Sequence, residues 1–121
     1  MPSTIALSGV IAEHVAAVNA FDLAALMATF SDDALVNDAR REFRGAGEIR
    51  RWAARELIGD RVTVEVTEVT EHYGDVIVRG RYDGNFDKSA LPGELILTNY
   101  IRVCGGKIVS LIVIRNVPAG Y

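Results

Sequence analysis

The chain has 121 residues, of which 50% are hydrophobic and 24% are charged, with a single cysteine and a formal net charge of -3. This length predicts one domain over residues 1–121, and the hydrophobic fraction is too high for a disordered chain. No apolar run approaches the roughly 20 residues that a membrane-spanning helix needs, and the net negative charge gives no general attraction to nucleic acid.

The amino-terminal segment predicts a cytoplasmic protein rather than a secreted one. Residues 1–7 contain no basic leader, and Glu13 and His14 soon interrupt the apolar positions that follow, so we expect no signal peptide. Cys104 is the single cysteine and cannot form an internal disulfide. Because it precedes Gly105, we interpret it as a small residue at the end of a strand.

The first third of the chain has the pattern of two helices. Apolar residues recur every three or four positions from Leu7 to Val18, which predicts an amphipathic helix with one packing side. His14 falls inside that apolar stripe. Asp22 is a typical N-cap residue and predicts the start of a second short helix over residues 23–29.

The next segment is expected to contain a turn, a short strand and a third helix. Residues 31–33 are Ser-Asp-Asp, which is typical of a turn, and residues 34–38 have the pattern of a strand. The third helix is expected over residues 48–58, where Glu56 lies in the apolar stripe and either extends to solvent or reaches a cavity. We interpret the neighbouring arginines as a solvated helix face: Arg40, Arg41, Arg44, Arg50, Arg51 and Arg55.

Beyond residue 61 the hydrophobic period changes to two, which predicts strands. A one-residue slip near position 67 indicates a β-bulge, and short turns make successive strands antiparallel neighbours. The expected strands cover residues 62–69, 76–86, 95–103 and 107–116, with one long loop at 87–93. Helices followed by strands predict an α+β fold with the helices gathered on one face of the sheet.

Three polar residues occupy faces that are otherwise apolar. His14 lies in the stripe of the first helix, Asp38 shares a strand face with aliphatic residues, and Asn99 alternates with aliphatic residues in the strand at 95–103. Each has an ordinary structural interpretation, a hydrogen-bonded core histidine or a strand-end cap for instance. Together, however, an acid/base group and two hydrogen-bond donors around one apolar volume are typical of a small-molecule site. The sequence contains no phosphate-binding loop, nucleophile motif or local metal-ligand spacing.

Five stretches of the chain carry a resemblance to a known family. Residues 15–23 (VAAVNAFDL), 30–38 (FSDDALVND), 45–52 (GAGEIRRW), 99–103 and 106–110 resemble the nuclear transport factor 2-like superfamily, most closely the ketosteroid isomerases and SnoaL-like polyketide cyclases. The resemblance covers nearly the whole chain. It implies a cone-shaped, curved antiparallel sheet with three helices on its concave face, a cystatin-like α+β barrel. It also implies a deep pocket, a homodimer formed through the outer sheet face, and no metal or organic cofactor.

The resemblance also implies roles for individual residues. Asp38 matches the catalytic base of the isomerase, which removes a proton beside a ketone and returns it two carbons away. His14 stands where the isomerase has an oxyanion-stabilising tyrosine, and Asn99 where it has a protonated aspartic acid. Both depart from the family, although a neutral imidazole and a carboxamide can each donate a hydrogen bond. Strand parity and the resemblance together give the expected pocket lining: Val36, Trp52, Tyr82, Leu97, Ile101, Leu111, Val113 and Arg115.

The sequence therefore predicts a cofactor-independent acid/base enzyme, isomerase-like or cyclase-like, that acts on a hydrophobic carbonyl compound. Two alternatives remain open, a non-catalytic domain that binds an apolar ligand and a dimeric interaction domain of the same fold. The arginine and aspartate cluster of limonene epoxide hydrolases is not reproduced, because residues 111–115 contain no aspartate. Arg115 suits a carboxylate-bearing or phenolic substrate, or it is a solvated strand end. Apolar residues on both faces of the last two strands predict a hollow pocket inside and a dimer surface outside.

Overall fold

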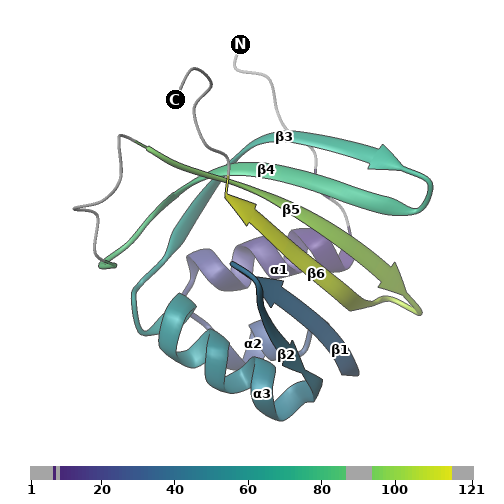
Figure 1. Cartoon of the computed structure of the whole chain (residues 1–121), viewed down its shortest axis with the longest axis horizontal. Coiled ribbons are helices and arrows are strands. Elements are labelled where there is room, and N and C mark those ends of the chain that lie inside the picture. Colours follow the sequence, from purple (N-terminus) through teal and green to yellow (C-terminus); the bar gives the residue numbers. More distant parts are fainter. Residues whose placement is uncertain (1–6, 8, 87–93, 116–121) are drawn as a thin grey trace.

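The computed structural model describes residue 7, residues 9–86 and residues 94–115 (Figure 1). Six strands form one curved sheet in the order β2-β1-β6-β5-β4-β3, and the helices lie under its concave side. In chain order the elements are α1 (Gly9–Asn19), α2 (Leu23–Met27), β1 (Phe30–Asp38), β2 (Arg41–Arg44), α3 (Gly45–Trp52), the π-helix η1 (Ala53–Ile58), β3 (Thr63–His72), β4 (Asp75–Asp83), β5 (Leu95–Cys104) and β6 (Lys107–Arg115). The predicted α+β class is confirmed.

The sheet is mixed rather than wholly antiparallel, which corrects the expected sheet type. β1 runs parallel to β6, with Val36 opposite Leu111 and Asp38 opposite Val113. The other neighbouring pairs are antiparallel. Short turns constrain only strands that follow one another in the chain, so no local pattern could reveal a pairing between the first and last strands.

The strands of the second half follow the predicted pattern closely. β3 and β4 change register between Val66 and Glu68, which confirms the bulge expected near residue 67. β4 ends at Asp83, before the expected end at Phe86. The expected loop at 87–93, the expected strand end at Asn116 and residues 1–6 of the segment expected to lack a leader lie outside the described residues. None of the helices in the described parts of the chain is long and apolar enough to cross a membrane.

Two short elements near the amino-terminal half differ from expectation. The turn expected at residues 31–33 is absent, because β1 runs through it with a register shift between Phe30 and Leu35. Helix α2 ends at Met27 rather than at residue 29, and its N-cap is as predicted, since Asp22 Oδ1 accepts a hydrogen bond of 3.0 Å from the amide of Ala25.

The third helix begins earlier than expected and changes its character. α3 starts at Gly45, and the residues after Trp52 continue as the π-helix η1. Gly59 follows η1, where an added Cβ would lie 2.5 Å from the carbonyl oxygen of Arg55, so a side chain does not fit there. Segments of π-helix are rare and often occur at functional sites. Glu56 and Leu57 of η1 both border the cavity described below.

The hairpin from β1 to β2 has a tight turn that the sequence did not indicate. Asp38 pairs with Arg41, and the two residues between them, Ala39 and Arg40, have φ angles of 54° and 69°. Both positive angles are those of a type I′ turn, which Asn-Gly sequences normally mark. The conformation costs a residue with a Cβ about 1 kcal/mol or more.

We expect Arg40→Gly to raise the free energy of unfolding by about 1 kcal/mol, because glycine adopts a positive φ without strain. Urea unfolding of the variant and the wild-type protein measures the difference. The matched control is Arg50→Gly, which changes another exposed arginine, inside α3. There the same change should lower stability by about 1 kcal/mol. Equal effects of the two substitutions would contradict the strained turn.

Candidate active site

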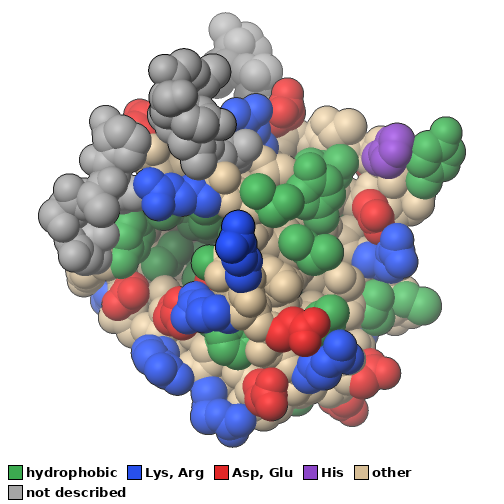
Figure 2. All heavy atoms as spheres, in the orientation of Figure 1, with side chains coloured by type: hydrophobic (Ala, Val, Ile, Leu, Met, Phe, Trp, Pro, Cys, Tyr) green, Lys and Arg blue, Asp and Glu red, His purple; other side chains and the backbone are tan. Residues whose placement is uncertain are grey.

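A cavity of about 250 Å³ lies between the helices and the concave face of the sheet. Figure 2 shows a hollow left of the centre of the molecule, with hydrophobic side chains inside it. The cavity is bordered by His14, Val18, Asp38, Ala39, Trp52, Glu56, Leu57, Asp60, Val62, Tyr82, Phe86, Leu95, Leu97, Asn99, Leu111, Val113 and Arg115. An apolar wall with a few polar groups is the usual composition of a small-molecule site.

The structure brings most of the expected site residues to this one cavity, and two of the expected lining residues lie elsewhere. Val36 is fully buried, because α3 packs on β1 and covers the inner face of that strand. Ile101 borders a smaller neighbouring cavity of about 20 Å³. The expectation that Val36 lines the pocket is therefore wrong, and Ile101 borders the smaller cavity instead of the larger one.

Asp38 is the last residue of β1 and is held through one of its two carboxylate oxygens. Oδ2 accepts a hydrogen bond of 3.1 Å from the indole Nε1 of Trp52 and one of 3.2 Å from Nη2 of Arg41. Oδ1 has no hydrogen-bond partner among the described residues. The carboxylate is thus fixed in orientation, and one oxygen remains available to a ligand in the cavity.

Arg41 is part of the site, although the sequence grouped it with the solvated arginines. Its guanidinium donates two hydrogen bonds of 2.7 Å to the two carboxylate oxygens of Glu56, and this pairing raises the pKa of Arg41. Glu56 therefore borders the cavity and is paired at the same time. The contact between Asp38 and Arg41 has a signal in the sequence, an aspartate and an arginine three positions apart. The contact between Arg41 and Glu56 has no such local signal.

His14 presents a hydrogen-bond acceptor to the cavity rather than the expected donor. Its Nδ1 lies 3.2 Å from Oγ1 of Thr29, and that hydroxyl donates its hydrogen over 2.6 Å to the carbonyl oxygen of Leu26. Nδ1 must therefore carry the ring proton and donate it to Thr29, which leaves an unprotonated Nε2. Burial lowers the pKa of His14 to about 4, so the ring is neutral at pH 7.

The position of Nε2 follows from the remaining contacts of the ring. Nε2 has no hydrogen-bond partner in the described part of the chain, and no fully buried side-chain nitrogen or oxygen there lacks one. Nε2 is therefore accessible, and the ring borders both the 250 Å³ cavity and the smaller one of about 20 Å³. Thr29, which decides the tautomer, was not recognised in the sequence, where it was assigned only to the end of a helix.

Asn99 also uses its donors within the protein. Its Nδ2 donates a hydrogen bond of 2.8 Å to the hydroxyl oxygen of Tyr82 and a longer one of 3.3 Å to the carbonyl oxygen of Val78. The carbonyl can only accept, so it fixes which end of the carboxamide is the NH₂ group. Asn99 therefore does not offer the free donor that the resemblance implies.

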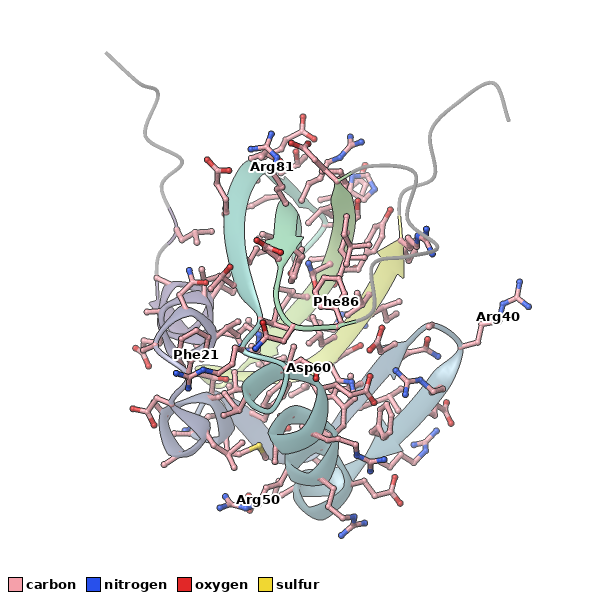
Figure 3. The ribbon with its side chains drawn as sticks, turned by 90° about the vertical axis from the view of Figure 1, so that its left-hand side faces the viewer. Phe21, Arg40, Arg50, Asp60, Arg81 and Phe86 are labelled. Carbon is pink, nitrogen blue, oxygen red and sulfur yellow. The ribbon has the colours of Figure 1, made fainter. Side chains whose placement is uncertain are left out.

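Charged side chains also border the cavity, and some of the lining residues, such as Asp60 and Phe86, were not expected from the sequence. Figure 3 shows Asp60 and Phe86 close together between the end of η1 and the sheet, while Arg40 and Arg50 point away from the molecule. Arg115 also borders the cavity and has no ion pair with a described residue. No group of three or more histidine, cysteine, aspartate or glutamate side chains in the described ranges could hold a metal ion.

Comparison with known proteins agrees with this architecture. The family model of the SnoaL-like domain matches residues 11–111. The chain is similar to a candidate polyketide cyclase from Sinorhizobium meliloti, with 26% identity and a TM-score of 0.77 over 89% of this chain and 95% of that one. It is also similar to an NTF2-like protein from Burkholderia thailandensis, with 27% identity and a TM-score of 0.73 over 91% and 92% of the two chains.

The same fold occurs in TerC, which was crystallised with polyporic acid; the identity is 16%, and the TM-score is 0.71 over 88% of each chain. No curated protein gives a significant match.

Proposed function

This chain belongs to the SnoaL-like domain family, and we propose that it is a cofactor-independent acid/base enzyme that acts on a hydrophobic carbonyl compound. The observation that carries the proposal is the state of Asp38. Asp38 borders the largely apolar cavity, one of its oxygens is held by Trp52 and Arg41, and the other has no hydrogen-bond partner among the described residues. The name of the similar Sinorhizobium meliloti protein, a candidate polyketide cyclase, supports the same class of chemistry.

The proposed reaction needs one base and one group that stabilises negative charge on oxygen. Oδ1 of Asp38 takes a proton from the carbon next to a carbonyl group. The electron pair of that C–H bond forms a carbon–carbon double bond, and the carbonyl π pair moves to oxygen. An isomerase then returns the proton to a second carbon. In a cyclase the enolate carbon attacks another carbonyl carbon, the π pair of that carbonyl moves to its oxygen, and the resulting alkoxide takes the proton back from Asp38. The substrate carbonyl is itself the electron sink, so no organic cofactor is required.

Hydrogen–deuterium exchange of a bound ketone tests the proposal directly. Members of a panel of β,γ-unsaturated and 1,3-dicarbonyl compounds that bind the protein are first identified by NMR titration in D₂O. We expect protons next to the carbonyl group of a bound compound to exchange faster with the protein than in buffer alone. If compounds bind in the cavity but none of them exchanges its protons faster than in buffer, the result would support a carrier domain and contradict the enzyme.

We also propose that the protein forms a homodimer through the outer face of β5 and β6. Tyr100, Ile112 and Ile114 lie on this face and remain 38%, 39% and 46% exposed. Figure 2 looks onto this side and shows hydrophobic side chains gathered over the two strands, with charged side chains around them. Apolar patches of this kind on a small domain mark interaction surfaces.

Light scattering tests the dimer. The wild-type protein should have twice the mass of the chain, and Ile114→Glu should shift the equilibrium to the monomer, because a buried, unpaired carboxylate is costly. The control is Tyr73→Glu, which places the same charge on a side chain that is 94% exposed in the β3–β4 turn. A monomeric wild-type protein would contradict the proposal.

A further inference from the structure

We propose that the hydroxyl group of Tyr82 donates the hydrogen bond that stabilises the substrate oxyanion, and that Asn99 positions this hydroxyl. The proposal rests on the function proposed for Asp38, and it names a second residue of the same cavity that touches the substrate. It replaces the donor role that the family resemblance gives to His14 and Asn99.

The hydrogen bonds of Asn99 determine which way the Tyr82 hydroxyl can donate. The hydroxyl oxygen accepts a hydrogen from Asn99 Nδ2 over 2.8 Å, so its own hydrogen cannot point toward that nitrogen. No described residue accepts this hydrogen. Both side chains border the 250 Å³ cavity and the smaller one of about 20 Å³ beside it, and this space is open to the hydrogen of the hydroxyl.

The other polar groups of the cavity lack a free donor or lie at its rim. The Nδ1 proton of His14 is directed to Thr29, which leaves Nε2 as an acceptor. The indole N–H of Trp52 is directed to Asp38. Arg115, whose donors are unpaired within the described ranges, is exposed at the end of β6. Among the described side chains that border the cavity, Tyr82 is thus the half-buried one whose hydrogen is not already donated to another group of the protein.

Electrostatics keep this hydroxyl protonated and couple it to the base. Burial raises the pKa of Tyr82 to about 12, the hydrogen bond from Asn99 opposes the rise, and the charge of Asp38 adds to it. The hydroxyl is therefore a neutral donor at pH 7. When Asp38 accepts a proton from the substrate, its charge disappears and the substrate oxygen becomes negative. The field of Asp38 no longer disfavours negative charge near Tyr82, so the donor becomes stronger in the transition state.

Binding of naphthols tests the donor without requiring turnover, because a naphtholate oxygen carries the charge of an enolate oxygen. The wild-type protein, Tyr82→Phe and the control Tyr73→Phe are titrated with naphthols of decreasing pKa. We expect Tyr82→Phe to weaken binding by about 10- to 100-fold, which is typical of losing a hydrogen bond to a charged group. Tyr73→Phe, which changes an exposed side chain, should bind as the wild-type protein does.

To test whether Asn99 positions the hydroxyl of Tyr82, the measurement must respond to their hydrogen bond and not to a general loss of packing. The hydroxyl proton between Tyr82 and a bound naphtholate should give a downfield NMR signal that is absent in Tyr82→Phe. In Asn99→Leu the ring of Tyr82 remains but its hydroxyl loses the donated hydrogen bond, so the signal should shift upfield or vanish. An unchanged signal in Asn99→Leu would overturn the positioning role.

The donor and the base can fail separately. Equal naphthol affinity of Tyr82→Phe and the wild-type protein would overturn the role of Tyr82, even if Asp38 proves to be the base. Conversely, Asp38→Asn should retain naphthol binding. If Asp38→Asn also retains full proton exchange while Tyr82→Phe loses affinity, the assignment of Asp38 as base fails and the donor remains supported.

Discussion

Replacing Asp38 by asparagine should lower kcat/KM for proton transfer by about 10²- to 10⁴-fold, which is the usual contribution of a positioned base. The variant keeps the shape of the side chain, and its amide oxygen can still accept the hydrogen bond from Trp52. It has no electron pair basic enough to take a proton from carbon. The expected loss therefore arises from the chemical step, and the measurement is the initial rate of exchange or isomerisation of a ketone that binds the wild-type protein.

The matched control for this substitution is Asp33→Asn. Asp33 lies on the same strand, is exposed outside the cavity and accepts a hydrogen bond from Ser31. We expect this variant to have the wild-type rate. Circular dichroism and urea unfolding verify that both variants are folded. Wild-type rates in Asp38→Asn would exclude Asp38 as the base, whatever the substrate.

Acid should destabilise the protein by about 3 kcal/mol through His14 alone. In the unfolded chain this histidine takes up a proton near its ordinary pKa of 6.5, whereas burial in the folded protein lowers its pKa to about 4. Between these two values the unfolded state binds more protons, so the free energy of unfolding falls as the pH is lowered. Each unit of difference contributes about 1.4 kcal/mol, and the contribution to stability is complete above pH 6.5 and lost below pH 4.

Urea unfolding between pH 7 and pH 4 measures this effect. His14→Gln removes the titrating ring, so its free energy of unfolding should fall less steeply over the same range than that of the wild-type protein. His72→Gln is the control, because His72 is the exposed last residue of β3 and the same substitution there removes no buried ring. Identical slopes for His14→Gln and the wild-type protein would show that the buried ring does not control the acid sensitivity.

Several elements could be predicted because their signals are local. The apolar stripe that contains His14 corresponds to α1, and alternation of apolar and polar residues identified β3, β5 and β6. The slip near residue 67 corresponds to the bulge between Val66 and Glu68. Each of these patterns compares a residue with neighbours a few positions away, which is the range over which helix and strand periodicity acts.

Elements that depend on distant contacts could not be predicted. The parallel pairing of β1 with β6 joins residues about 75 positions apart, such as Asp38 and Val113. The π-helix η1 and the positive φ angles of Ala39 and Arg40 oppose local preferences, and the surrounding structure holds them in place. All three lie beside the cavity. Functional sites are the places where the observed structure most often departs from the preferences of the local sequence.

For the site itself, the sequence alone determined which polar side chains stand out. Asp38, His14 and Asn99 each interrupt an apolar face, and such interruptions are visible in a one-dimensional pattern. The tertiary structure alone decided what each side chain can do. Thr29 determines the tautomer of His14, and the carbonyl of Val78 determines the orientation of Asn99. Whether a side chain donates or accepts a hydrogen bond depends on which atom of a distant residue lies next to it. A periodic sequence pattern contains no information about such a contact.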